Sequence, residues 1–88
     1  MFSGHALRRM FERQIGKDDV LAVISSGEVI DDYPDDSPYP SCLLLGFVDK
    51  RPLHAAIAVN LEGKTCYVIT AYPPNPDLWH DFRTRKTS

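Results

Sequence analysis

The sequence has few of the residues that could form disulfides or metal sites in a small protein. Its 88 residues include two cysteines, Cys42 and Cys66, and one tryptophan. Both cysteines lie in apolar, strand-like runs. Neither belongs to a Cys-x-x-Cys pair or to a histidine and cysteine cluster with metal-ligand spacing. We therefore expect reduced, buried core thiols, with a zinc site or a disulfide as the alternative, and we expect no metal or other cofactor.

The chain also lacks a hydrophobic run long enough to span a membrane, and charged residues come too early in it for a signal peptide. It has no nucleotide-binding loop, nucleophile elbow or zinc signature. Basic residues are not in excess, because the formal net charge is −2 and the isoelectric point is near 5.8. This balance argues against a general nucleic-acid coat protein and permits a local basic patch. We expect a cytoplasmic protein with no membrane partner.

The composition is ordinary for a globular protein, with 43% hydrophobic and 25% charged residues. The length fits one domain over residues 1–88. A chain of this size buries roughly 60–65% of its unfolded surface, so its stability is marginal. A partner chain or a homodimer interface is therefore expected to add stability.

Two helices are predicted in the first part of the chain. Residues 3–14 form an amphipathic helix with Ser3 as its N-cap. Its apolar side carries Ala6, Leu7, Met10, Phe11 and Gln14. Its other side carries His5, Arg8, Arg9, Glu12 and Arg13. This second side is either a solvated face with local pairing to the glutamate or an anion-binding face, because arginine forks match phosphate geometry.

The second helix is short and begins near Asp18 and Asp19, where negative charge is favoured. Its buried stripe is Val20, Leu21, Val23 and Ile24. Gly27 fits the glycine position that follows a helix.

Four antiparallel strands are predicted next, and they cover residues 28–33, 41–48, 53–60 and 64–72. Gly46 indicates a bulge or a close approach by a neighbouring element. The first strand and its loop, residues 28–36, hold five of the twelve acidic residues and no base. We interpret them as an exposed acidic edge, which discourages unwanted strand pairing, with paired catalytic carboxylates as the alternative.

The last two strands form a hairpin, whose register decides which residues share a face. A turn at 61–63 with Gly63 at φ > 0 would pair Asn60 with Lys64 and place His54 opposite Thr70. The face with small residues then holds Ala56, Ala58, Cys66 and Val68, and it ends in His54, Thr70 and Tyr72. The bulky face, which we expect to be core, holds Leu53, Ala55, Ile57, Val59, Thr65, Tyr67, Ile69 and Ala71.

After the hairpin, Asn75 as N-cap and Pro76 at the first helical position predict a short C-terminal helix. The residues expected to dock it on the sheet are Leu78, Trp79 and Phe82. A basic tail follows, made of Arg83, Arg85 and Lys86. The predicted order is α-α-β-β-β-β-α, an α+β fold in which helices cover an antiparallel sheet of about four strands.

The residues that could carry chemistry are cationic and aromatic. They are His5, Arg8, Arg9, Arg13, Lys50, Arg51, His54, Tyr67, Tyr72, Arg83 and Arg85. No carboxylate or metal centre stands out among them, and such a set suits RNA cleavage by metal-free acid–base chemistry. In that chemistry a base takes the 2′-hydroxyl proton, arginines stabilise the pentacoordinate phosphate, and an acid protonates the leaving oxygen.

We expect His54, Tyr72 and Arg9 to be catalytic. Histidine titrates near neutrality, and a tyrosine can orient a base, stack on a nucleobase or donate a proton. The residues expected to bind RNA are His5, Arg8, Arg13, Arg51 and Arg83. Structural roles are the alternative for the two central residues: His54 as a strand histidine bonded to Thr70, and Tyr72 as an aromatic packed on the prolines that follow it.

Several motifs together resemble a known family. They are His5-Ala-Leu-Arg-Arg-Met10 with Arg13, Gly27-Glu-Val-Ile30 with Tyr33-Pro34, Arg51-Pro-Leu-His54, Ile69-Thr-Ala-Tyr72, and Trp79. They resemble a family of small bacterial and archaeal domains that is catalogued only as a domain of unknown function. Its members are encoded beside a small zinc-ribbon antitoxin-like protein, so the resemblance implies such an antitoxin as the partner.

More distantly, the layout resembles BrnT-type toxins, which belong with the RelE-like ribonuclease toxins and whose matching strand ends Ile-Ser-Ala-Arg. This resemblance implies a RelE/BrnT-like fold and the toxin of a type II toxin–antitoxin pair, an endoribonuclease that acts on mRNA. Tyr72 stands where BrnT has its arginine, so the role of that arginine does not carry over. The isoelectric point near 5.8 also departs from the basic RelE-like toxins.

A second class of function fits the same sequence. The chain would then be a non-catalytic protein-binding or dimerisation module. Its docking surface would be the face with small residues, Ala56, Ala58, Cys66 and Val68, and the arginines would contact an acidic segment of the partner.

Overall fold

A computed structural model of the chain describes residues 1–86. Two helices come first, α1 (Gly4–Glu12) and α2 (Lys17–Ser26). The four long strands are β1 (Glu28–Tyr33), β2 (Ser41–Val48), β3 (Arg51–Asn60) and β4 (Thr65–Tyr72). A small hairpin at the end pairs β5 (Trp79–His80) with β6 (Thr84–Arg85).

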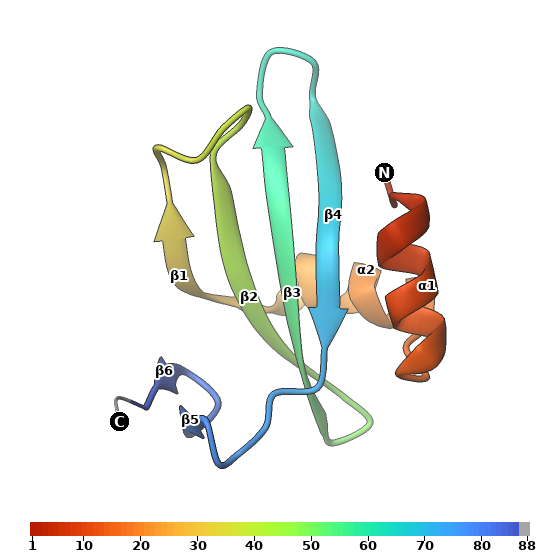
Figure 1. Ribbon diagram of the computed structural model, residues 1–88, viewed down its shortest axis with the longest axis vertical. Coiled ribbons are helices and arrows are strands. Elements are labelled where there is room, and N and C mark those ends of the chain that lie inside the picture. Colours follow the sequence, from red (N-terminus) through yellow and green to blue (C-terminus); the bar gives the residue numbers. More distant parts are fainter. Residues whose placement is uncertain (87–88) are drawn as a thin grey trace.

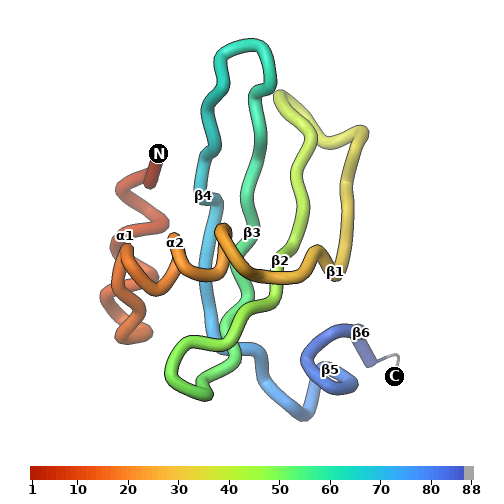
Figure 2. The backbone as a smooth tube through the Cα atoms, turned by 180° about the vertical axis from the view of Figure 1, so that it is seen from behind, coloured from red at the N-terminus to blue at the C-terminus, as the bar shows by residue number. Residues whose placement is uncertain are grey.

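The long strands form one antiparallel sheet in the order β1-β2-β3-β4, and the helices cover one of its faces (Figures 1 and 2). α2 crosses β2 and β3, while α1 lies beside β4. The first residues of the chain extend the β4 edge, because the Val68 N–H donates to the Met1 carbonyl at 2.8 Å. The predicted α+β arrangement of two helices and a four-stranded antiparallel sheet is confirmed. None of the helices in residues 1–86 is long and apolar enough to cross a membrane.

The core lies between the helices and the covered face of the sheet. Its buried members are Ala6, Met10, Ile15, Val20, Val23, Leu44, Leu53, Ala55, Ile57, Val68 and Ala71. Two glycines let α2 approach the sheet: a Cβ at Gly46 would lie 2.9 Å from the Val23 side chain, and one at Gly27 would lie 2.9 Å from the Leu45 carbonyl oxygen. The close approach predicted at Gly46 is confirmed. Gly27 has φ −75°, so lack of space explains this glycine and a left-handed backbone does not.

Both ends of α1 are held by specific hydrogen bonds. The Ser3 hydroxyl accepts a backbone N–H of the first turn at 3.0 Å, which confirms the predicted N-cap. At the other end Gln14 takes a left-handed φ of 58°. The Arg51 guanidinium donates to the carbonyls of Arg13 and Gln14 at 2.8 and 2.9 Å. The helix end is thus joined to the start of β3.

The predicted apolar sides of both helices are partly wrong. α1 ends at Glu12, so Gln14 lies beyond it, and Phe11 is 85% exposed. In α2, Leu21 is also exposed. Ala6 and Met10 are the buried residues of α1, and Leu7 and Ile24 are half-buried against the same core, so the apolar side of each helix is narrower than predicted.

The predicted hairpin register is wrong. Asn60 pairs with Thr65, because Lys64 belongs to the turn and takes φ 52°, while no glycine in residues 1–86 has a positive φ. A bulge between Ala56 and Ile57 then shifts the pairing again, so that His54 faces Tyr72. An extra residue in one strand changes the face of every side chain beyond it, which local sequence patterns do not reveal.

The register change moves the residues from Thr65 to Ile69 between the faces. Cys66 and Val68 lie on the helix side with the core, whereas Tyr67 and Ile69 lie on the open side. The docking surface predicted from Ala56, Ala58, Cys66 and Val68 is therefore wrong. Cys42 and Cys66 are both free and half-buried.

The predicted C-terminal helix is absent. The Asn75 side chain accepts the Asp77 N–H at 2.9 Å, as a cap would, but the chain makes only one turn there. It then forms β5 and β6 around Asp81 and Phe82, which have φ of 50° and 62°. The capping residues were recognised correctly, but a helix this short is unstable by itself, and tertiary contacts of the segment decide its structure.

Replacing Gln14 with glycine should raise the free energy of unfolding by about 0.5–1 kcal/mol, because glycine takes the left-handed backbone without a Cβ clash. Chemical denaturation of Gln14→Gly and of the control Gln14→Ala checks this. Equal stability of the two variants would contradict the helix end described above.

Candidate functional site

The polar end of the β3–β4 hairpin is organised by one buried histidine. His54 is 0% exposed. Its Nε2 lies 2.6 Å from the Phe82 carbonyl oxygen, and its Nδ1 lies 3.3 Å from the Tyr72 hydroxyl. Because a carbonyl only accepts, Nε2 carries the proton and donates it. Nδ1 therefore accepts, and the Tyr72 hydroxyl donates to it.

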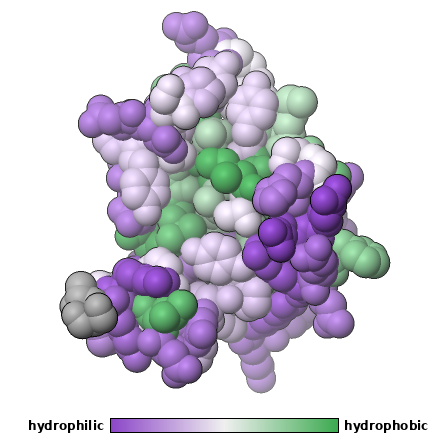
Figure 3. All heavy atoms as spheres, viewed as in Figure 1, coloured by the Kyte–Doolittle hydropathy of each residue, from purple (hydrophilic) through white to green (hydrophobic). Residues whose placement is uncertain are grey.

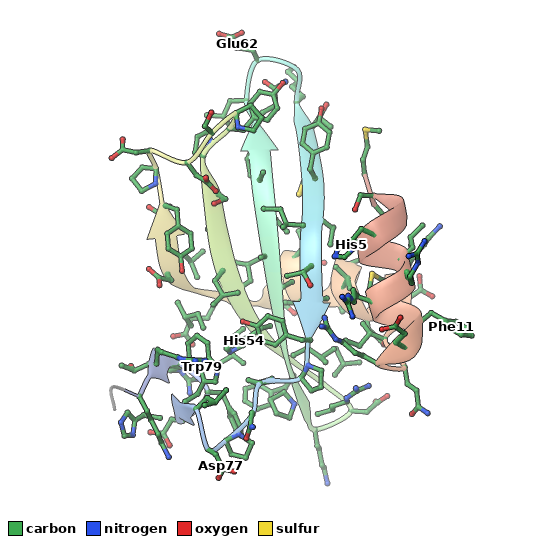
Figure 4. All side chains as sticks on the ribbon, viewed as in Figure 1. His5, Phe11, His54, Glu62, Asp77 and Trp79 are labelled. Carbon is green, nitrogen blue, oxygen red and sulfur yellow. The ribbon has the colours of Figure 1, made fainter. Side chains whose placement is uncertain are left out.

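The C-terminal hairpin closes over this histidine (Figure 4). The Trp79 ring meets the His54 ring edge-on, with centroids 4.5 Å apart. Phe82 contacts Phe47 of β2 in the same manner, at 6.4 Å. Burial lowers the pKa of His54 below its ordinary value, although the hydrogen bond to Phe82 acts in the opposite direction. His54 is therefore neutral at pH 7, with its Nδ1 lone pair directed at Tyr72.

Tyr72 is the member of the pair that is only half-buried. Burial raises the pKa of its hydroxyl, and the positive charges of Arg85 and Arg13 act in the opposite direction. The Arg13 guanidinium donates to the Ala71 carbonyl at 2.9 Å and to the Thr70 hydroxyl at 3.3 Å. The Arg85 guanidinium lies 5.6 Å from the centre of the Trp79 ring. Two cations from distant parts of the chain thus lie near one phenol.

α1 and its C-cap residue carry a column of one histidine and two arginines that leads to this phenol. His5, Arg9 and Arg13 are spaced four residues apart, so each is offset by about 40° from the previous one along one flank of the helix. Arg13 fixes the direction of that flank, because it bonds to β4. His5 lies between α1 and β4 in Figure 4. Arg9 is exposed and forms a 3.4 Å pair with Glu12.

The chain matches the family described as a domain of unknown function, DUF4258, over residues 2–73. It belongs to this family. No curated protein and no solved structure matches the chain. The DUF4258 match includes both helices, the four-stranded sheet and Tyr72, and it ends before Trp79. The hairpin that covers His54 therefore lies outside the matched part.

The structure brings some of the predicted site residues of this DUF4258 chain together. His54 and Tyr72 form the hydrogen-bonded pair, Arg13 lies near it, and Arg9 and His5 share its flank of α1. The structural alternative that bonded His54 to Thr70 is wrong, because the register places Tyr72 there.

Other predicted residues have different contacts. Arg51 holds the end of α1, and Arg83 pairs with Glu28 at 3.2 Å. Arg8 lies on α1 away from the column, about 100° from the flank that carries Arg9.

Sequence reasoning missed the place of Arg85 beside Tyr72 and the role of the Phe82 carbonyl. Trp79 was recognised as an anchor, though not as the cover of His54. Residues 1–86 contain no group of three histidine, cysteine or acidic residues that could hold a metal ion.

The burial of His54 predicts a specific pH dependence of stability. Its folded pKa is lowered, so the stability it contributes is complete above about pH 6.5, the ordinary histidine pKa, and is lost as the pH falls through the folded pKa. The stability difference between wild type and His54→Gln should therefore be larger at pH 7 than at pH 5, as measured by denaturation.

The control is His80→Gln, which removes an exposed histidine from β5. Its stability difference from wild type should not change with pH in this manner. A pH-independent difference for His54→Gln would contradict the neutral, buried histidine.

Proposed function

We propose that the protein is a metal-independent endoribonuclease that acts on mRNA as the toxin of a type II toxin–antitoxin pair, with a fold of the RelE/BrnT type. The observation that carries the proposal is the position of the Tyr72 hydroxyl. It lies 3.3 Å from the unprotonated Nδ1 of a buried, oriented His54 and near the positive charges of Arg13 and Arg85. A reactive hydroxyl, a base and a group that orients the base are the usual parts of such a site.

In the proposed reaction Tyr72 touches the substrate and His54 acts through it. The Tyr72 oxygen accepts the proton of the ribose 2′-hydroxyl while its own proton passes to His54 Nδ1. The 2′-oxygen attacks phosphorus, and the bond to the 5′-oxygen breaks. The proton returns through Tyr72 to that leaving oxygen, giving a 2′,3′-cyclic phosphate and a 5′-hydroxyl end.

The lowered pKa of His54 supports this role, because it keeps Nδ1 free to accept the proton at neutral pH. The Phe82 carbonyl supports it too, because it fixes the tautomer that presents Nδ1 to Tyr72. Arg13 and Arg85 would neutralise the charge that develops on the phosphate oxygens, the task for which guanidinium groups are suited.

The RNA backbone would approach along α1. His5, Arg9 and Arg13 rise about 6 Å per step along the helix and end beside Tyr72. They give a local basic track on a chain with a net charge of −2. The proposed set of RNA contacts is therefore narrower than the sequence suggested, because Arg51 and Arg83 are engaged elsewhere, and it gains Arg85.

The biological setting rests on the resemblance to toxins. We propose a cytoplasmic protein that pairs with a zinc-ribbon antitoxin. Expression without the antitoxin would arrest growth, and expression with it would restore growth.

Cleavage of a labelled single-stranded RNA of mixed sequence, and of an mRNA on translating ribosomes, tests the proposal in the presence of EDTA. Tyr72→Phe should reduce the rate by about 100-fold or more, because the proton path is removed while the ring remains against His54. The control Tyr33→Phe, which changes an exposed tyrosine of β1, should cleave like wild type.

Two outcomes would contradict different parts of the proposal. Unimpaired cleavage by folded Tyr72→Phe would reject the site. A wild-type chain that cleaves neither RNA would reject the activity itself.

A further inference from the structure

Among residues 1–86, the sheet face opposite the helices is covered only at its His54 end, by the C-terminal hairpin, and the rest of this face is hollowed (Figure 3). Two adjoining hollows of about 630 and 490 Å³ share Asp36 and Ile69. We call these two hollows together the open-face groove. Its apolar floor is formed by Ala56, Ala58 and Ile69, and its aromatic walls are Tyr33, Tyr39 and Tyr67. The Tyr39 and Tyr67 rings stack with centroids 5.7 Å apart, so one wall is preformed.

The rim of the groove is acidic. Asp32, Asp35 and Asp36 line the hollows, and no lysine or arginine does. Hydrogen bonds from Ser41 and from the Ser37 N–H lower the pKa of Asp36, so this carboxylate stays charged. An apolar floor with such a rim favours an occupant that combines an apolar side chain with a cation, and it repels the phosphates of RNA.

The chain carries a surface of that kind on α1. Phe11 is 85% exposed and points away from the molecule in Figure 4. Arg8 lies one helical turn before it and is exposed as well. We call these two residues the α1 knob. They lie on a different flank of α1 from the column of His5, Arg9 and Arg13.

We propose that the open-face groove binds the α1 knob of a second copy of this chain. Phe11 enters the apolar floor between the tyrosine walls, and Arg8 pairs with the acidic rim at Asp35. This is a helix-in-groove contact made by two different surfaces. It goes beyond the proposed RNA cleavage and uses none of the residues assigned to it.

The contact has a consequence for assembly. The groove lies on the open face, whereas α1 lies beside β4 (Figure 1), so one copy docked in another leaves a free knob and a free groove. Such heterologous contacts continue until a ring closes. Self-association should therefore grow with concentration, and it should weaken at high salt, which screens the exposed ion pairs.

A complementation experiment tests the proposal. The knob variant is Arg8→Gln/Phe11→Gln, and the groove variant is Asp35→Lys/Ile69→Thr. All four changed residues are exposed, so each variant should fold, and circular dichroism checks this. Sedimentation equilibrium of each protein from about 10 μM to about 1 mM measures the dissociation constants.

Wild type should associate, and each variant alone should dissociate at least about tenfold more readily. An equimolar mixture of the two variants should form a complex of one copy of each and stop there. It stops because the mixture contains one intact groove and one intact knob per pair. The matched control Leu21→Gln removes an exposed apolar residue from α2 and should associate like wild type.

Three outcomes would overturn the proposal. The first is a wild-type protein that stays at the monomer mass of 9.9 kDa over the whole concentration range. Variants that associate like wild type are the second, and a mixture that stays monomeric is the third. If wild type stays monomeric and a basic peptide binds the groove, a different protein is the occupant.

Discussion

The buried hydrogen bonds of His54 connect the parts of this protein that sequence distance separates. One ring nitrogen donates a hydrogen bond to the carbonyl of Phe82 in the C-terminal hairpin. The other accepts a hydrogen bond from the hydroxyl of Tyr72 at the end of β4. A buried imidazole must satisfy both nitrogens, since an unpaired polar group in such a place costs about 1–3 kcal/mol. The histidine therefore determines where the last part of the chain docks and how the Tyr72 hydroxyl is directed.

The backbone of that hairpin also depends on this contact. Phe82 takes φ 62°, a conformation that a residue with a bulky side chain adopts at a cost. The same conformation turns its carbonyl to His54, and its ring packs on Phe47. Local strain at the turn is thus offset by tertiary contacts. The packing of the hairpin also excludes water from the imidazole, and this burial lowers the pKa of His54, although the Phe82 hydrogen bond acts in the opposite direction.

The two sides of the sheet divide the roles of the molecule. The covered side holds nearly all the apolar core, and α1 carries cationic side chains past the β4 edge toward Tyr72. The open side keeps its tyrosines and its acidic rim, so its charge is opposite to that of α1. A net charge near zero therefore conceals two surfaces of opposite sign, which explains why composition alone excluded little.

Local sequence patterns were sufficient to predict the elements whose bounds depend on nearby residues alone. The bounds of β1 and β2 were predicted correctly, because prolines end β1 and because β2 is almost continuously apolar. The Ser3 cap was correct for the same reason. The hairpin register failed because a turn at Lys64 and a bulge after Ala56 are not visible in an alternating pattern.

The candidate site was foreseen in part. The sequence places His54 and Tyr72 at one end of a hairpin, and Arg9 and Arg13 on one helix, which identifies the region. It does not reveal that His54 is completely buried, because Trp79 and Phe82 come from a segment whose local signals indicated a helix. Only the docking of that segment selects the tautomer of His54.

Every role assigned to His54 requires a neutral ring that is protonated at Nε2 and accepts at Nδ1. Nitrogen NMR of the imidazole ring in the folded protein at pH 7 measures this most directly. We expect a protonated Nε2 coupled to its hydrogen and an unprotonated Nδ1 whose chemical shift indicates an accepted hydrogen bond. In Tyr72→Phe the Nδ1 chemical shift should no longer indicate that hydrogen bond. A proton on Nδ1, or a doubly protonated ring at that pH, would contradict the account.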